Sequence, residues 1–99
     1  MQQGIWLINR NNMKKKEKFY EFYVYITLHG CYSETAVLHV GYQSASIHHG
    51  SYPTWYSEPV SKSQVDSIYD KVKRFDGEYT SDTSYVKELI TYYINEAKK

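Results

Sequence analysis

The clearest strand signal in the sequence is KFYEFYVYITL, residues 18–28. Its β-branched and aromatic residues are typical of a strand, and successive side chains of a strand point to opposite faces. One face is mixed and includes Glu21, Tyr23 and Tyr25, whereas the other is apolar throughout. The apolar face comprises Tyr20, Phe22, Val24, Ile26 and Leu28. We therefore expect the apolar face to pack on the core and the mixed face to be amphipathic.

A second strand is predicted in ETAVLHVGY, residues 34–42, after the break HGCYS at residues 29–33. Its apolar set is Ala36, Leu38, Val40 and Tyr42, and Val37 and His39 share the opposite face. Only an odd-numbered hairpin loop, of three residues around Gly30 or of five, places both apolar sets on one side of the sheet. We expect a third strand within residues 44–49 or 54–57, and IWLI at residues 5–8 is a candidate for a fourth.

Two helices are predicted to follow the strands. Ser61 and Gln64 form a capping box, Val60 and Val65 form a hydrophobic staple, and Gly77 ends the first helix. Its apolar stripe is Val65, Ile68, Tyr69, Val72 and Phe75. The second helix is expected to begin in TSDTS, residues 80–84, and Tyr85 and Tyr92 widen its stripe. That stripe is Val86, Leu89, Ile90, Tyr93, Ile94 and Ala97.

Strands first and helices last predict an α+β fold. Residues 18–99 form a single domain, in which a small antiparallel sheet of three or four strands packs on two antiparallel C-terminal helices. Residues 1–17 are an N-terminal extension or an edge strand with a basic linker, and Met13, followed by three lysines, is an alternative start. With both helices on one face, the sheet face that carries Tyr23, Tyr25, Val37 and His39 stays uncovered.

Composition limits the classes of partner. The chain has 99 residues and a net charge of +1, and residues 19–61 contain three glutamates but no lysine or arginine. Because nucleic-acid affinity comes largely from basic side chains at phosphates, this region disfavours nucleic acid, although the basic N-terminal arm remains an alternative. A single cysteine excludes an intrachain disulfide, and no apolar run is long enough to cross a membrane. We expect a cytoplasmic protein of a bacterial host cell.

The segment YQSASIHHGSYPTWYSEP, residues 42–59, resembles an antibody paratope in composition. Tyrosine and tryptophan provide rigid contact area, and the two prolines stiffen the chain. We read it as an irregular recognition loop that acts together with the uncovered sheet face. The alternative is that Trp55 plugs one end of the core. The predicted binding residues are Tyr23, Tyr25, His39, His48, His49, Tyr52, Trp55 and Tyr56.

Catalytic and metal chemistry find little support in the sequence. The four histidines and Cys31 do not match the spacing of a metal site, and adjacent histidines on a strand point apart. No nucleophile elbow or phosphate-cradling glycine loop is present. The sequence therefore predicts no catalytic residue, no metal and no cofactor.

The leading hypothesis is a non-enzymatic small binding protein, namely a phage or mobile-element inhibitor of a host or defence protein. Self-association into a homodimer is another use of the same surface. A first alternative is an oligomer that sequesters a nucleotide-like ligand, whose phosphate Lys71, Lys73 or Arg74 would contact. A second alternative is nucleic-acid binding through the basic N-terminal arm.

Overall fold

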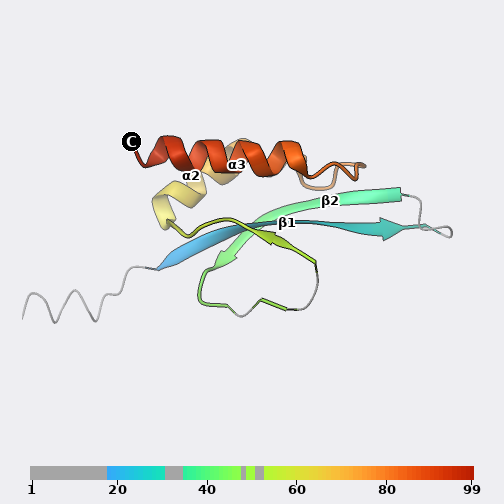
Figure 1. Ribbon diagram of the computed structural model, residues 1–99, viewed down its shortest axis with the longest axis horizontal. Helices are drawn as coiled ribbons and strands as arrows, with labels where there is room; N and C mark the ends of the chain where they lie inside the picture. Colours follow the sequence, from blue (N-terminus) through green and yellow to red (C-terminus); the bar gives the residue numbers. More distant parts are fainter. Residues whose placement is uncertain (1–17, 31–34, 48, 51–52) are drawn as a thin grey trace, which may run out of the picture.

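The computed structural model describes residues 18–30, 35–47, 49–50 and 53–99. Four antiparallel strands precede two helices, and both helices lie on one face of the sheet (Figure 1). The elements are β1 (Phe19–His29), β2 (Thr35–Ser44), β3 (Trp55–Tyr56), β4 (Val60–Ser61), α2 (Lys62–Val72), the 3₁₀ turn η1 (Lys73–Phe75) and α3 (Ser84–Ala97). The α+β arrangement is therefore confirmed, whereas residues 5–8 lie outside the described residues.

β1 is the central strand, with β2 on one side and β3 and β4 on the other. Val24 lies opposite Val40, so the apolar sets of β1 and β2 share the face that meets the helices. His29 pairs with Thr35, which leaves five residues to connect the strands. The expected odd-numbered hairpin loop is thus confirmed.

β3 and β4 form one edge strand that is interrupted by a bulge. Tyr56 pairs with Tyr23 and Val60 pairs with Tyr20, so three residues on the edge oppose two on β1. Ser57 bridges the bulge, because its N–H donates to the Phe22 carbonyl and its hydroxyl accepts from the Phe22 N–H, both at 2.9 Å. A third strand within residues 54–57 is confirmed.

The start of α2 follows the sequence signals, whereas its end lies before the expected position at Gly77. The Gln64 N–H donates to the Ser61 hydroxyl at 3.4 Å, and the Gln64 side chain accepts from the Ser61 N–H at 3.2 Å, which completes the capping box. α2 ends at Val72 and η1 continues to Phe75, so Gly77, with a φ of 88° that favours glycine, follows the 3₁₀ turn and not α2 itself. The Gln64 side chain also donates to the Ala97 carbonyl at 3.5 Å, so the start of α2 meets the end of α3 and the helices are antiparallel.

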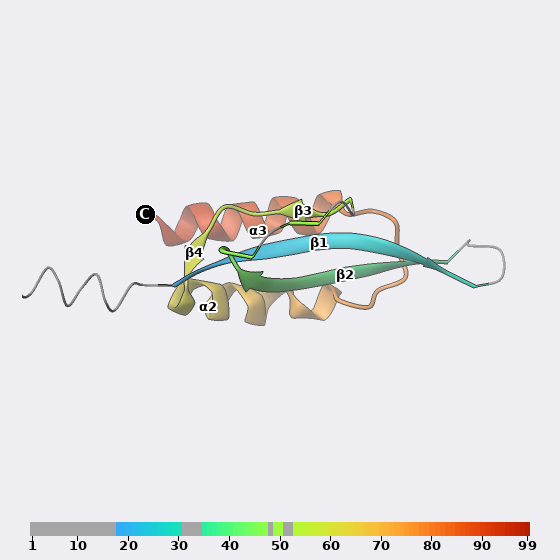
Figure 2. The ribbon, with the colours of Figure 1, turned by 90° about the horizontal axis from the view of Figure 1, so that it is seen from below.

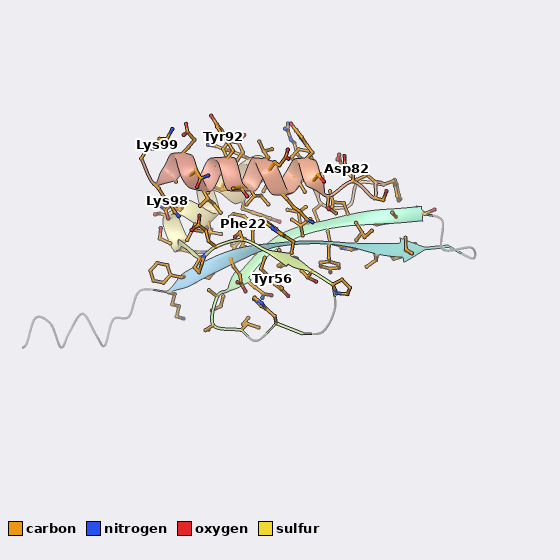
Figure 3. All side chains as sticks on the ribbon, viewed as in Figure 1. Phe22, Tyr56, Asp82, Tyr92, Lys98 and Lys99 are labelled. Atoms are coloured by element: carbon orange, nitrogen blue, oxygen red, sulfur yellow. The ribbon has the colours of Figure 1, made fainter. Side chains whose placement is uncertain are left out.

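The core lies between the sheet and the helices. In Figure 2, α2 runs along β2, and α3 runs on the side of β3. Tyr92, on α3, points away from the sheet in Figure 3 and is 57% exposed. The buried apolar side chains are Phe22, Val24, Leu38, Val40, Val60, Val65, Ile68, Val72, Val86, Ile90 and Ile94. No helix in the described ranges is long and apolar enough to span a bilayer.

The segment between the helices is hydrogen-bonded to the outer edge of β2. The Leu38 N–H donates to the Glu78 carbonyl at 2.8 Å, and the Gly77 N–H donates to the Leu38 carbonyl at 2.7 Å. One step along the strand, the Asp76 carboxylate accepts from the Val40 N–H at 2.9 Å. These bonds satisfy backbone groups that an edge strand would otherwise leave unpaired, and they fix Asp76 beside the sheet.

Ile90→Ala should lower the free energy of unfolding by about 2–5 kcal/mol, because Ile90 is fully buried and its loss leaves a cavity. Urea unfolding followed by circular dichroism measures the change. Tyr79→Ala is the control, since Tyr79 is 81% exposed and should change stability by less than about 0.5 kcal/mol. Equal effects of the two substitutions would contradict the assignment of Ile90 to the core.

Candidate functional site

The sheet face opposite the helices, which we call the open face, carries the candidate site. It is built from the odd-numbered residues of β1 and β2 together with Tyr56 of β3. The described residues between β2 and β3 lie on the same side of the sheet as this face (Figure 1). Its principal residues are Glu21, Tyr23, Tyr25, Thr27, His39, Gly41, Gln43 and Tyr56.

The Tyr25 and His39 rings are stacked at the centre of the open face. The two residues are opposite each other in the register, and their ring centroids are 4.6 Å apart with an interplanar angle of 7°. The Thr27 hydroxyl lies 2.8 Å from Nε2 of His39 and 2.7 Å from Nε2 of His29. The hydroxyl therefore holds the His39 ring in its stacked position.

A second stacked pair is anchored by a buried carboxylate. The His49 and Tyr56 rings are 3.5 Å apart and almost parallel, at 2°. Nε2 of His49 donates to Oε1 of Glu21 at 2.6 Å, and the Gln43 amide donates to the same oxygen at 3.0 Å. Glu21 is only 5% exposed. Because a buried carboxylate needs partners, this group ties the segment after β2 to the strands.

Glu21 is a site residue that was not singled out from the sequence as a binding residue. The residue is the only carboxylate on β1, and the five-residue connection places Gln43 opposite it. The register alone could therefore have predicted the contact between Glu21 and Gln43. The position of His49 could not have been predicted, because it depends on how the connection to β3 folds back over the sheet.

Tyr23 lies across Gly41 on the neighbouring strand. A Cβ atom at Gly41 would come within 2.4 Å of the Tyr23 hydroxyl oxygen, so the ring occupies the space that a side chain there would need. Burial, the nearby Tyr25 hydroxyl and the Asp76 carboxylate raise the pKa of Tyr23 above its usual value. Tyr23 is thus held neutral and flat against the sheet.

The structure divides the predicted binding residues into two groups. Tyr23, Tyr25, His39, His49 and Tyr56 lie on the open face, whereas Trp55 lies on the opposite face. Trp55 packs against the core and lines a hollow with side chains of α3. This placement favours the alternative in which Trp55 supports the core. His48 and Tyr52 lie outside the described residues.

The expectation that residues 42–59 form one irregular loop is wrong. β2 continues to Ser44, and Trp55–Tyr56 and Val60–Ser61 pair with β1. The β propensity of Tyr42, Trp55 and Tyr56 prevails over the turn-forming residues between them, because β1 offers an unpaired edge. The aromatic residues are consequently fixed by strand pairing, which is more rigid than a loop.

The cations proposed to contact a phosphate lie on the helical layer. Lys71 lies over the Tyr93 ring, 4.7 Å from its centroid, and Lys73 pairs with Asp70 at 2.9 Å. Arg74 lies beside Phe75. The hollows lined by Trp55 include Lys87 and none of these three. These hollows therefore do not place the three proposed cations beside Trp55.

Catalytic and metal-binding arrangements are limited in the described part of the chain. Thr27 and His39 place a hydroxyl beside a base, but within the described residues His39 contacts the Thr27 hydroxyl and the Tyr25 ring and no carboxylate that would orient it. Nor do three or more histidine, cysteine, aspartate or glutamate side chains gather there as metal ligands. The geometry that stands out is the pair of stacked aromatic groups, which suits recognition.

Comparison with protein-family models, with curated proteins and with solved structures gave no match. The function must accordingly be argued from the geometry of this chain.

His49→Ala should lower the free energy of unfolding by about 1–3 kcal/mol, because it removes a ring stack and a hydrogen bond to a buried carboxylate. Chemical denaturation measures the loss. His29→Ala is the matched control, since His29 is exposed and its ring lies within hydrogen-bond distance of the exposed Thr27 hydroxyl. A loss no larger than that of the control would show that His49 does not anchor the segment.

Gly41→Ala should destabilise the protein by about 1–3 kcal/mol, because its methyl group would overlap the Tyr23 ring. In a Tyr23→Ala background most of this cost should disappear, since the ring is absent. Thermal unfolding of both single variants and the double variant measures the coupling. Gly50→Ala is the control, because among the described residues no atom beyond its chain neighbours lies within 4 Å of its Cβ position. Purely additive effects would contradict the contact.

Proposed function

We propose that the protein is a non-enzymatic binding protein that docks on a target protein through the open face of its sheet. The observation that carries the proposal is the presence of two stacked tyrosine–histidine pairs, Tyr25 with His39 and Tyr56 with His49, on one helix-free face. Tyrosine is enriched at the centres of protein interfaces, where it supplies a large contact area with few rotatable bonds.

The fixed positions of the two stacked pairs support a role in protein docking. The Tyr25–His39 pair is fixed by strand register and by the Thr27 hydroxyl, and the Tyr56–His49 pair is fixed by Glu21. Side chains that are ordered before binding lose less conformational entropy when a partner arrives. The open face therefore has the pre-organisation that a tight protein interface requires.

Charge supports a target with a basic surface. The described residues of both hairpin strands, 19–29 and 35–44, carry Glu21 and no lysine or arginine, and Asp76 borders the edge of β2. We propose that the target is a host or defence protein in the cytoplasm of a bacterium and that this chain is a phage or mobile-element inhibitor. The support for this origin is compositional, namely twelve tyrosines and only two prolines in 99 residues.

The test compares capture by C-terminally tagged proteins from bacterial lysate, with and without phage infection, followed by mass spectrometry and binding of the purified target. Wild type should retain a target that the open-face variant Tyr25→Ser, Tyr56→Ser binds at least tenfold more weakly. The matched control is Tyr79→Ser, Tyr92→Ser, which removes two exposed tyrosines away from the open face and should bind like wild type.

Equal binding by the open-face variant would overturn the proposal, as would the absence of any retained protein in both lysates. Analytical ultracentrifugation of the same proteins tests whether the chain self-associates. A wild-type dimer that becomes a monomer only in the open-face variant would assign the surface to a homodimer instead of a foreign target. Amide NMR spectra check that both double variants are folded.

A further inference from the structure

A hollow of about 380 Å³ opens where the open face meets the outer edge of β2. We call it the β2-edge pocket. Gly41 and Val40 of β2 lie along it, and its remaining lining is aromatic apart from one carboxylate. Those side chains are Tyr23, Tyr25, His39, Tyr42, Tyr69 and Asp76. No lysine or arginine is among the lining residues that the structure describes.

The walls of this pocket are fixed by strand pairing and by the hydrogen bonds between residues 76–78 and β2. Gly41 leaves the space in which the Tyr23 ring lies, and the Tyr42 and Tyr69 rings meet edge to face with centroids 5.2 Å apart. Asp76 is exposed, and its Oδ1 accepts from the Val40 N–H, so the carboxylate is held at the pocket with capacity for a further donor. Burial is the main cause of the raised pKa of Tyr23, and the Asp76 carboxylate also raises it, consistent with a negative electrostatic potential in the pocket.

Elsewhere in the chain, two tyrosine rings and a carboxylate bind a cation, the ammonium group of Lys62. The Lys62 ammonium lies 5.2 Å from the centroid of Tyr20 and 5.5 Å from that of Tyr42. The same ammonium pairs with Asp66 at 3.2 Å. Ring faces carry negative electrostatic potential, so a cation held by rings and a carboxylate is attracted by both. The β2-edge pocket likewise combines tyrosine rings with a carboxylate, that of Asp76.

We propose that the β2-edge pocket receives an arginine side chain of the docked target protein. A planar guanidinium stacks on tyrosine rings while its N–H groups reach a carboxylate, which a lysine ammonium does less well. The volume is at the small end of the range for ligand pockets, roughly 300–1,000 Å³, and suits one side chain better than a large cofactor. This inference rests on the proposed function and names the chemistry of its partner.

The direct test uses three probe peptides, acetyl-Gly-Xaa-Gly-amide with arginine, lysine or citrulline at Xaa, titrated into the full chain labelled with ¹⁵N. The arginine peptide should shift the amide signals of Val40, Gly41 and Asp76 and bind in the millimolar range. The lysine peptide should bind several-fold more weakly. The citrulline peptide, which has the shape of arginine without its charge, should bind at least tenfold more weakly.

Asp76→Asn is the decisive variant, because the asparagine oxygen can still accept from the Val40 N–H while the charge is lost. It should weaken arginine-peptide binding roughly tenfold, which corresponds to about 1.4 kcal/mol. Asp82→Asn is the matched control, since Asp82 likewise accepts from a backbone N–H, that of Ser84, and does not line the pocket. That control should change the affinity less than twofold.

Equal binding of the arginine and citrulline peptides, or an unchanged affinity of Asp76→Asn, would overturn the pocket assignment. The purified target separates a partner's arginine from a free small cation. Asp76→Asn should weaken target binding at least fivefold, and undiminished binding would overturn this inference while leaving docking through the open face intact. Conversely, if the arginine peptide binds in a way that depends on Asp76 but no target is captured, the pocket assignment is supported and the proposed function is overturned.

Discussion

With Val24 opposite Val40, the β1–β2 hairpin places every even-numbered side chain of both strands on the helix side and every odd-numbered one on the open face. Both layers of the protein follow from this register. It buries Phe22 and Leu38 against the helices and at the same time brings Tyr25 over His39 and Tyr23 over Gly41. A slip of one residue would exchange the two faces, so the core and the candidate site are specified by the same pairing.

Two carboxylates connect the hairpin to segments that are distant in the sequence. Glu21 binds His49 and so holds the segment after β2 against the sheet, whereas Asp76 binds the Val40 N–H and holds the segment after α2 against the strand edge. Both bonds span more than two dozen residues of sequence. The open face and the β2-edge pocket therefore depend on contacts between distant parts of the chain as much as on the strands themselves.

Local signals were sufficient for much of the fold. The alternation in residues 18–28 predicted which side of β1 is buried, and Ser61 with Gln64 predicted the start of α2. Trp55 and Tyr56 were not separable from the sequence, because two residues of strand give no period, and only their pairing with β1 sends them to opposite faces. Asp76 gave no signal either, since its role depends on where the end of η1 meets β2.

The bulge at residues 57–59 has a consequence for the behaviour of the chain in concentrated solution. β1 is eleven residues long, is rich in aromatic and β-branched side chains and contains no proline, a composition that favours cross-β aggregation when such a strand is accessible. Here β1 is central, one neighbouring edge is twisted by the bulge and contains Pro59, which has no N–H to donate, and the other is covered in part by residues 76–78. A chain with twelve tyrosines thus carries protection against fibril growth at both edges of its sheet.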